Sequence, residues 1–225
     1  MDVRESLATI KKQINAAAEA SSRNQERVNV VAVTKYVSVE RTKEALDAGL
    51  MHFGESRDEG LLEKVKALGT TPSWHFIGTL QSRKVKEVIP FVDYIHSLDR
   101  RSLAKEIQKR ADREINCFVQ VNVSGEDSKH GLSLDHTIPF IESLKEFSSI
   151  KVIGLMTMAP HTDDRNEIRS VFKQLRELGE RIQNLSLSHA PCNELSMGMS
   201  NDYEIAVEEG ATYVRIGSSL VGNEK

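Results

Sequence analysis

The feature that most constrains this chain is an alternation, repeated eight times, between short β-branched segments and longer segments with apolar residues three and four positions apart. Short apolar runs of this kind predict buried strands, and the longer spacing predicts amphipathic helices. The predicted strands are 28–33, 52–54, 74–77, 94–97, 116–123, 152–156, 194–197 and 213–216. The predicted helices between them are 39–48, 58–68, 83–89, 100–111, 134–147, 166–184 and 202–209.

The order of these elements indicates an α/β fold with a parallel sheet, because strands that alternate strictly with helices are covered by those helices. Eight such units in 225 residues fit a single (β/α)8 barrel of the TIM type better than an open doubly wound sheet, which usually has fewer strands. No Pro/Gly/Ser-rich linker divides the chain, so we expect one domain over residues 1–225. The chain ends soon after the last strand, and we expect a leading helix at 3–18 to complete the outer ring.

Charge and composition narrow the function classes. The formal net charge is −3, with basic and acidic residues interspersed, which gives no electrostatic footprint for nucleic acid or membranes. The charged start has no signal-peptide pattern and no run is long enough to span a membrane, so we expect a cytoplasmic protein. Cys117 and Cys192 are predicted to be reduced thiols, and the histidine spacings predict no metal site.

Lys35 is the first candidate functional residue, because it follows the apolar run Val30-Val31-Ala32-Val33-Thr34. In a barrel, the end of such a strand faces the mouth where active sites form, and a partly desolvated amine there can attack a carbonyl. The alternative is a lysine that leaves the core and extends its amine to water.

A second candidate site is Arg215-Ile216-Gly217-Ser218-Ser219, at the end of the eighth strand. Gly217 allows a ligand to approach the backbone closely, and the N–H and hydroxyl groups of Ser218 and Ser219 can bind anionic oxygens where barrels commonly hold phosphate. An ordinary Gly-Ser turn is the alternative interpretation.

A third candidate is Ser200, in the stretch Leu195-Ser196-Met197-Gly198-Met199-Ser200-Asn201-Asp202 after the seventh strand. We expect its hydroxyl and backbone N–H at the N-terminus of the next helix, which attracts anions. The alternative is helix capping alone, with Asn201 and Glu204 forming a variant of the capping box.

An amine after the first strand and phosphate donors after the seventh and eighth fit the two ends of a phosphorylated aldehyde, since the first and eighth strands are neighbours in a closed barrel. The predicted cofactor is pyridoxal 5'-phosphate (PLP), joined to Lys35 as a Schiff base. Arg215 could donate to the pyridine nitrogen, which would weaken the cofactor as an electron sink, or it could pair with Glu55. A barrel that binds another phosphorylated metabolite without covalent chemistry is a further alternative.

At these same residues the chain resembles the pyridoxal-phosphate-binding homeostasis proteins, whose fold is a single barrel like the N-terminal domain of alanine racemases, fold type III among PLP proteins. The stretches that carry the resemblance run nearly end to end: Ala32-Val33-Thr34-Lys35, His52-Phe53-Gly54-Glu55, Trp74-His75-Phe76-Ile77-Gly78, Leu80-Gln81-Ser82, Gln120-Val121-Asn122-Val123-Ser124-Gly125-Glu126 with Ser128-Lys129 and Gly131, Gly154-Leu155-Met156-Thr157-Met158-Ala159-Pro160, Leu195 through Ser200 with Asp202, and Val214-Arg215-Ile216-Gly217.

The resemblance implies a role for each matching residue. Lys35 would form the Schiff base, Ser200 and the turn of Gly217 and Ser218 would hold the phosphate, and Arg215 would approach the ring nitrogen. Met199 is expected on the pocket floor. Ser56 stands where the family commonly has Asn, so its contact with the ring hydroxyl is expected to be lost or replaced by water.

The resemblance also implies a PLP carrier or buffer in vitamin B6 homeostasis without established catalysis, rather than an enzyme. Racemases need a second acid/base on the opposite face of the cofactor, and we expect Tyr36 to point away from Lys35 if the strand continues to these residues. The alternative is a PLP-dependent amino-acid racemase of weak or narrow activity. PLP-dependent apoenzymes are candidate partners, a monomer is expected, and His75 is interpreted as a hydrogen-bonded structural residue.

Overall fold

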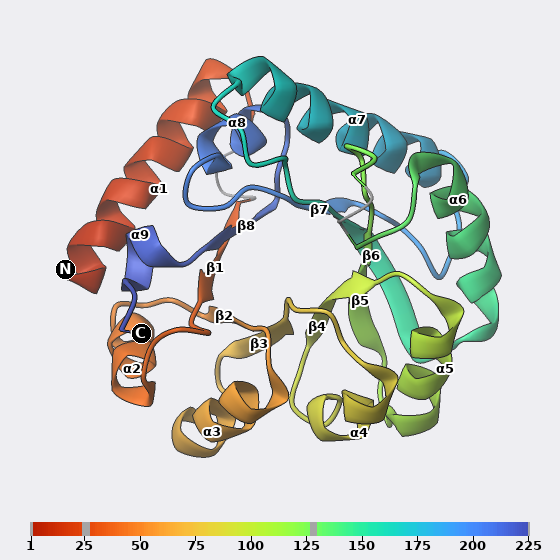
Figure 1. Cartoon of the computed structure of the whole chain (residues 1–225), viewed down its shortest axis with the longest axis horizontal. Coiled ribbons are helices and arrows are strands. Elements are labelled where there is room, and N and C mark those ends of the chain that lie inside the picture. The colour runs from red at the N-terminus through yellow and green to blue at the C-terminus, as the bar shows by residue number, and fades with distance from the viewer. Residues whose placement is uncertain (1, 24–27, 127–129, 225) are drawn as a thin grey trace.

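Eight parallel strands close into one barrel in chain order (Figure 1), which confirms the predicted fold class. The structure is a computed structural model that describes residues 2–23, 28–126 and 130–224, so Ser128 and Lys129 lie outside the described residues. The strands are β1 (Asn29–Val33), β2 (His52–Glu55), β3 (Ser73–Phe76), β4 (Tyr94–Leu98), β5 (Ile115–Gln120), β6 (Ile150–Met156), β7 (Glu194–Ser196) and β8 (Tyr213–Ile216).

Closure of the barrel decides which strand ends meet. On one side of β1, Val31 pairs with His52 of β2, and on the other side the same residue pairs with Arg215 of β8. Because all the strands are parallel, their carboxyl ends open at one mouth. The segments that follow β1 and β8 are therefore neighbours there, as the sequence predicted.

Helices cover the outside of the barrel and bury their apolar stripes against it. In α7, Ile168, Val171, Leu175, Leu178 and Ile182 are buried at the three- and four-residue spacings of one helix face. The helices are α1 (Val3–Ala20), α2 (Val39–Asp47), α3 (Asp58–Leu68), α4 (Val85–Val88), α5 (Arg101–Arg110), α6 (Leu134–Ser143), α7 (Arg165–Gln183), α8 (Tyr203–Glu208) and α9 (Ser218–Val221), with 3-10 turns η2 (Ser82–Lys84) and η3 (Leu144–Glu146).

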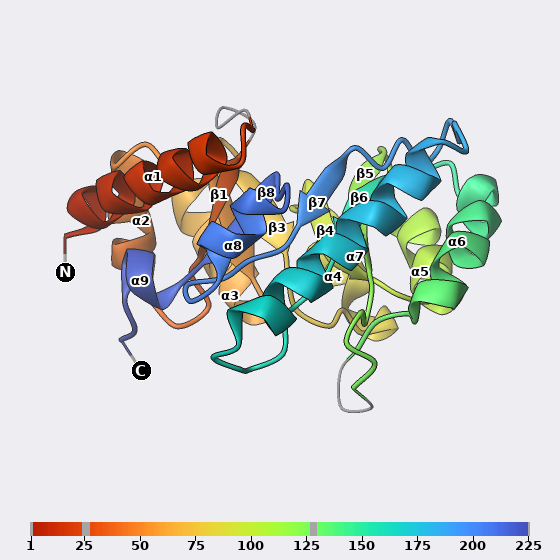
Figure 2. The same cartoon turned by 90° about the horizontal axis from the view of Figure 1, so that it is seen from above.

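The leading helix α1 completes the outer ring, as predicted. It packs against α8, α9 and α2 (Figure 1) and buries Val3, Leu7, Ile10 and Ile14. The helix after β8, α9, has only four residues and leaves most of the final position for α1. The first and last described residues therefore lie on the same side of the molecule (Figure 2).

The barrel interior differs from the apolar layer between strands and helices. Inside the barrel, a small cluster of Val31, Phe118, Met156 and Tyr213 is separate from the main core. Two buried histidines, His75 and His96, lie against this cluster, with ring centroids 5.9 Å and 6.4 Å from the ring of Tyr213. The barrel centre is thus aromatic and partly polar.

Two other predictions concern the whole chain. Cys117 and Cys192 are both free and buried, which confirms the reduced thiols. In the part of the chain that the structure describes, no helix combines the length and the apolar character that crossing a bilayer would take.

Candidate functional site

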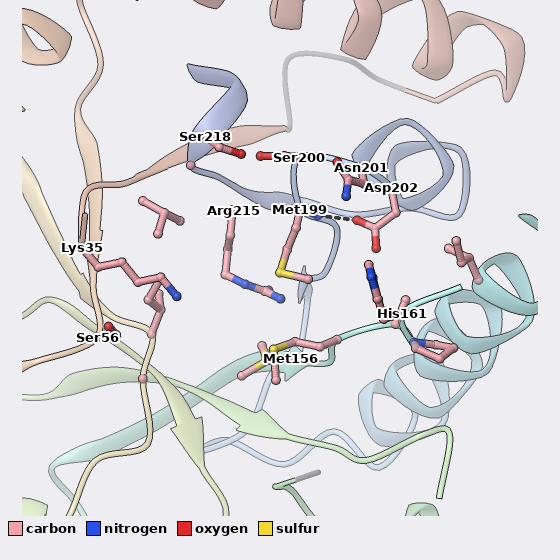
Figure 3. Close-up of a pocket in the computed structure, with 18 of the residues that line it drawn as sticks. Lys35, Ser56, Met156, His161, Met199, Ser200, Asn201, Asp202, Arg215 and Ser218 are labelled. Atoms are coloured by element: carbon pink, nitrogen blue, oxygen red, sulfur yellow. Dashed lines mark hydrogen bonds between the residues drawn. The ribbon is translucent and has the colours of Figure 1, made fainter. Parts of the chain in front are cut away.

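A pocket of about 970 Å³ opens at the carboxyl-terminal mouth of the barrel (Figure 3). Its lining includes all seven residues predicted for the site: Lys35, Ser56, Met199, Ser200, Arg215, Gly217 and Ser218. They come from segments that follow β1, β2 and β7 and from β8 with its following turn. The fold therefore brings together residues up to 183 positions apart in the chain.

Lys35 lies in a turn rather than on the strand, because β1 ends at Val33. The backbone N–H of Val37 closes this turn on the carbonyl oxygen of Thr34 at 3.1 Å. Lys35 is exposed, so the structure does not show the partial desolvation that was expected of its side chain. Figure 3 shows its amine directed into the pocket.

Tyr36 does not point away from Lys35, because the condition for that expectation fails: β1 ends at Val33, before either residue. The Nζ atom of Lys35 lies 4.8 Å from the centroid of the Tyr36 ring, and Tyr36 also lines the pocket. The alternation of side chains that would separate neighbours applies only within a strand, and the turn begins at Thr34.

A buried ion pair between Lys64 and Glu55 holds the backbone at the start of the turn that carries Lys35. Nζ of Lys64, on α3, donates to Oε1 of Glu55 at 2.5 Å and to the carbonyl oxygen of Thr34 at 2.6 Å. The hydroxyl of Thr34 donates to the same carboxylate oxygen at 2.6 Å. Glu55 is thus occupied by Lys64, and its proposed pairing with Arg215 is wrong. One signal in the sequence could have identified Lys64, because it lies at the same three- and four-residue spacing as Leu61, Val65 and Leu68 on the apolar face of the predicted helix.

Arg215 is a buried cation at the centre of the pocket. Its Nη1 donates to Oγ of Ser196 at 2.6 Å and its Nη2 donates to the carbonyl oxygen of Thr157 at 2.9 Å. Among the described residues, no carboxylate hydrogen bonds to it, although the charge of Asp202 acts on it from nearby. Burial lowers the pKa of Arg215 to about 10, which leaves it protonated at neutral pH. A buried cation that lines a cavity and has no hydrogen-bonded carboxylate among the described residues is suited to an electron-rich or anionic ligand.

Ser200 and Ser218 face each other across one side of the pocket (Figure 3). Ser218 is the first residue of the short helix α9, whereas Ser200 lies in a turn and not at a helix N-terminus. The prediction for Ser200 is wrong in this respect because α8 begins only at Tyr203. An added Cβ at Gly217 would lie 3.5 Å from Val33, which is an ordinary contact distance, so the protein itself does not require glycine at this position. The expectation that glycine is needed there to let a ligand approach the backbone stays a prediction.

The turn that carries Met199 and Ser200 is held by Asp202, and the capping box of Asn201 and Glu204, which was the alternative interpretation, is not formed. Oδ1 of Asp202 accepts from the backbone N–H of Met199 at 2.5 Å, while α8 has no side-chain cap. Gly198 enters this turn with φ of +92°, and a Cβ there would lie 2.6 Å from the Cβ of Ala206. Only glycine therefore fits at this position.

Inside the barrel, a row of hydrogen-bonded side chains runs from Arg215 at the carboxyl-terminal mouth to the amino-terminal end of the barrel. Ser196 Oγ lies 2.8 Å from Nδ1 of His96, whose Nε2 lies 2.9 Å from Nδ1 of His75. Nε2 of His75 then lies 3.0 Å from Nδ1 of His52. Burial holds the pKa of both His75 and His96 well below the ordinary value. His75 is hydrogen-bonded, as predicted, but the row itself was not foreseen.

The chemistry available at this mouth follows from its three polar parts. Lys35 supplies an amine, Arg215 supplies a fixed positive charge, and the pair of Ser200 and Ser218 supplies hydroxyl donors. A ligand that satisfies all three combines a carbonyl, a ring or group that accepts a hydrogen bond, and an anionic end. Among the described residues, no cluster of three or more histidine, cysteine or acidic side chains is arranged to hold a metal ion.

Comparison with protein families and with curated proteins gives consistent results. The model of the alanine racemase N-terminal domain matches residues 6–225. The chain is 40% identical to the pyridoxal phosphate homeostasis protein of Aquifex aeolicus, over the full length of both chains. It is 32% identical to the protein of the same name from Escherichia coli K12, covering 98% of this chain and 96% of that one.

Solved structures extend the comparison to three dimensions. PipY of Synechococcus elongatus, solved with PLP bound, superposes with a TM-score of 0.86 at 30% identity, over 98% of this chain and 100% of that one. An alanine racemase from Clostridium difficile superposes with a TM-score of 0.75 at 14% identity, over 97% of this chain and 56% of the racemase. The second similarity concerns the fold, and it ends where the racemase continues into further structure.

Proposed function

Since this chain belongs to the pyridoxal phosphate homeostasis protein family and has the alanine racemase N-terminal barrel, we propose that it binds PLP covalently at Lys35 and acts in PLP homeostasis. The single observation that carries the proposal is the position of the buried Arg215 cation in the same pocket as the Lys35 amine. PLP bound in PipY, a relative of 30% identity, supports it.

The residues of the pocket fit the parts of PLP. The amine of Lys35 condenses with the aldehyde, forming a C=N bond and releasing one water molecule. Arg215 donates to the pyridine nitrogen with a side chain that stays charged, which keeps a proton off that nitrogen. When bound, PLP supplies a conjugated ring that can withdraw electrons, and Arg215 limits this capacity.

The remaining site residues hold the other end and the sides of the cofactor. Ser200, Ser218 and the backbone at Gly217 bind the phosphate, because the two serine side chains face each other in the pocket (Figure 3) and Gly217 directly precedes Ser218 in its lining. Met199 packs against the ring, and Ser56 lies near the ring hydroxyl with a side chain shorter than the Asn common in the family.

We assign the protein the role of a carrier rather than an enzyme. Racemisation needs a second acid/base opposite Lys35, and the Tyr36 ring lies beside the Lys35 amine rather than across a bound cofactor from it. The open mouth suits release of PLP to apoenzymes. We propose a monomer, since the large exposed apolar side chains among the described residues are few and dispersed or line the pocket.

The direct test is the Lys35→Ala variant, with Lys43→Ala on the exposed surface of α2 as its matched control. Wild type and control should be yellow after incubation with PLP, and borohydride should fix the cofactor mass on the peptide that contains Lys35. The Ala variant should lose both signals. Fixation on another lysine, or a wild type that takes up no cofactor, would refute the proposal, and the latter would favour a different phosphorylated ligand.

Hydrogen exchange at the α-carbon separates a carrier from a racemase. Incubation of the PLP-loaded protein with a panel of L-amino acids in deuterated water should show no steady incorporation of deuterium. Lys35-dependent exchange at ordinary enzyme rates would establish the racemase instead. Transfer of PLP is tested by mixing the loaded protein with a PLP-dependent apoenzyme and following recovery of that enzyme's activity. Light scattering tests the proposed monomer by measuring the molar mass in solution.

A further inference from the structure

The row of His52, His75, His96 and Ser196 ends on Arg215 and crosses the barrel interior from end to end. His52 is half-buried and lines a separate hollow of about 460 Å³ at the amino end, together with Lys11 of α1 and Asn29 of β1. His75 and His96 are fully buried, and the ring of His75 stacks on Tyr94 with centroids 4.2 Å apart and an interplanar angle of 4°. The rings are therefore fixed in position.

The number of protons on each group decides which atom donates and which accepts in every hydrogen bond of this row, and so gives the row a direction. Arg215 has only donors, so Ser196 Oγ must accept from it, at 2.6 Å. The hydroxyl proton of Ser196 is then free to donate to Nδ1 of His96 at 2.8 Å. That makes His96 the Nε2–H tautomer, which donates to Nδ1 of His75 at 2.9 Å. By the same step, Nε2–H of His75 donates to Nδ1 of His52 at 3.0 Å.

If all the hydrogen bonds ran in the opposite direction, the one between His96 and Ser196 would leave a buried proton without an acceptor. If every histidine carried its proton on Nδ1, His96 would also donate to Ser196 Oγ, which already accepts from Arg215. The hydroxyl proton of Ser196 would then have no acceptor among its hydrogen bonds in the described structure. A buried donor without an acceptor costs free energy, so the first direction is favoured.

The rings in this row are also neutral. Burial disfavours a charge on His96, and the nearby charge of Arg215 would repel it further. His75 is faced by His52 and His96. Burial disfavours a charge on His52, the opposing charge of Asp93 favours it, and Lys11 lies in the same hollow. A charged ring would need two acceptors, whereas the row offers one.

We propose that Ser196, His96, His75 and His52 are positioning residues that hold the Arg215 guanidinium as an oriented donor toward the ring nitrogen of PLP. The row gives Arg215 a neutral acceptor, so that its charge is not cancelled by a carboxylate and its remaining N–H groups face the pocket. This inference rests on the proposed function for its ligand, but the direction of the row is a property of the protein alone.

The first test uses the ligand-free protein. Two-dimensional nitrogen–proton spectra of histidine rings distinguish the Nδ1–H tautomer, the Nε2–H tautomer and the charged ring. At pH 7 the signals of His52, His75 and His96 should all be those of neutral Nε2–H rings. A neutral Nδ1–H tautomer or a charged ring at His75 or His96 would overturn the inference, whether or not the protein binds PLP.

The second test compares two variants of nearly equal size. In His96→Asn, the side-chain oxygen reaches the position of Nδ1 and can accept from Ser196, whereas in His96→Leu nothing accepts. In the Leu variant, the guanidinium signals of Arg215 should merge through faster rotation, and the dissociation constant for PLP should rise about tenfold, as expected if the less well held Arg215 loses its hydrogen bond to the ring nitrogen. The Asn variant should stay close to wild type on both readouts.

The outcomes separate the two proposals. If wild type binds PLP at Lys35 and the Asn and Leu variants behave alike, the positioning role is refuted while the proposed function stands. If wild type does not bind PLP, the proposed function fails, and the ring tautomers and the Arg215 signals still decide whether the row is ordered.

Discussion

Acidification from pH 7 to pH 5 should destabilise this protein, because His75 and His96 are buried without charge inside the barrel. Burial lowers the pKa of both rings well below the ordinary value of 6.5. In the unfolded chain the same rings titrate near 6.5, so the unfolded state binds more protons as the pH falls. The stability contributed by a lowered histidine pKa is therefore present above pH 6.5 and is lost below it.

The size of the effect follows from the two pKa values. A histidine that stays neutral in the folded state and titrates near 6.5 in the unfolded state loses about 2 kcal/mol of stability between pH 7 and pH 5. The two buried rings together account for about 4 kcal/mol, a large fraction of the stability of an ordinary domain. Half-buried His52 adds to this in the same direction, because burial also lowers its pKa.

Urea denaturation at several pH values measures the effect. Carboxylates also change the stability of wild type over this range, so the informative quantity is the difference between wild type and His96→Leu. The variant should lose about 2 kcal/mol less than wild type between pH 7 and pH 5. His136→Gln removes an exposed ring and should follow wild type. Parallel curves for wild type and His96→Leu would refute the assignment of a neutral buried His96.

Two further predictions concern the frame of the site and of the barrel. Lys64→Met leaves the buried Glu55 carboxylate without its cation and should destabilise the protein by about 3–5 kcal/mol in urea denaturation. The double variant Lys64→Met with Glu55→Gln should recover much of this loss, because the buried charge is then also removed. Equal destabilisation in the single and the double variant would contradict the ion-pair account. Gly154→Ala places a Cβ 2.0 Å from a backbone oxygen of β7 and should lower the free energy of unfolding by about 3 kcal/mol or more. Gly179→Ala in α7, where the nearest atom to the added Cβ lies at 3.5 Å, should be neutral or stabilise the protein by up to about 1 kcal/mol. Similar melting temperatures for the two variants would contradict the steric argument.

The arrangement of the elements could be read from the sequence because it depends on local patterns. Apolar spacing distinguishes strands from helices, and eight alternations leave few topologies other than a closed barrel. Most strand predictions lie within a residue or two of the observed bounds, and the largest excess, 116–123 against Ile115–Gln120, is at a carboxyl end where the chain leaves the sheet for the mouth.

The location of the site was also predictable, for a reason of geometry. All parallel strands end at one mouth, and closure makes the first and eighth strands neighbours, so Lys35 and Gly217 had to lie near each other. What failed was local detail at strand ends. The turn at Thr34 brings Tyr36 beside Lys35, and Ser200 lies before its helix because Asp202 holds the turn.

The sequence by itself thus determined the barrel, the order of its elements and the mouth where the site forms, because hydrophobic period and chain order encode these directly. Only the tertiary structure decided which buried polar groups meet. Lys64 with Glu55, and the row from His52 to Arg215, join side chains from different strands and helices whose directions depend on register and barrel tilt. A one-dimensional pattern records that a residue is buried, but not which partner satisfies it.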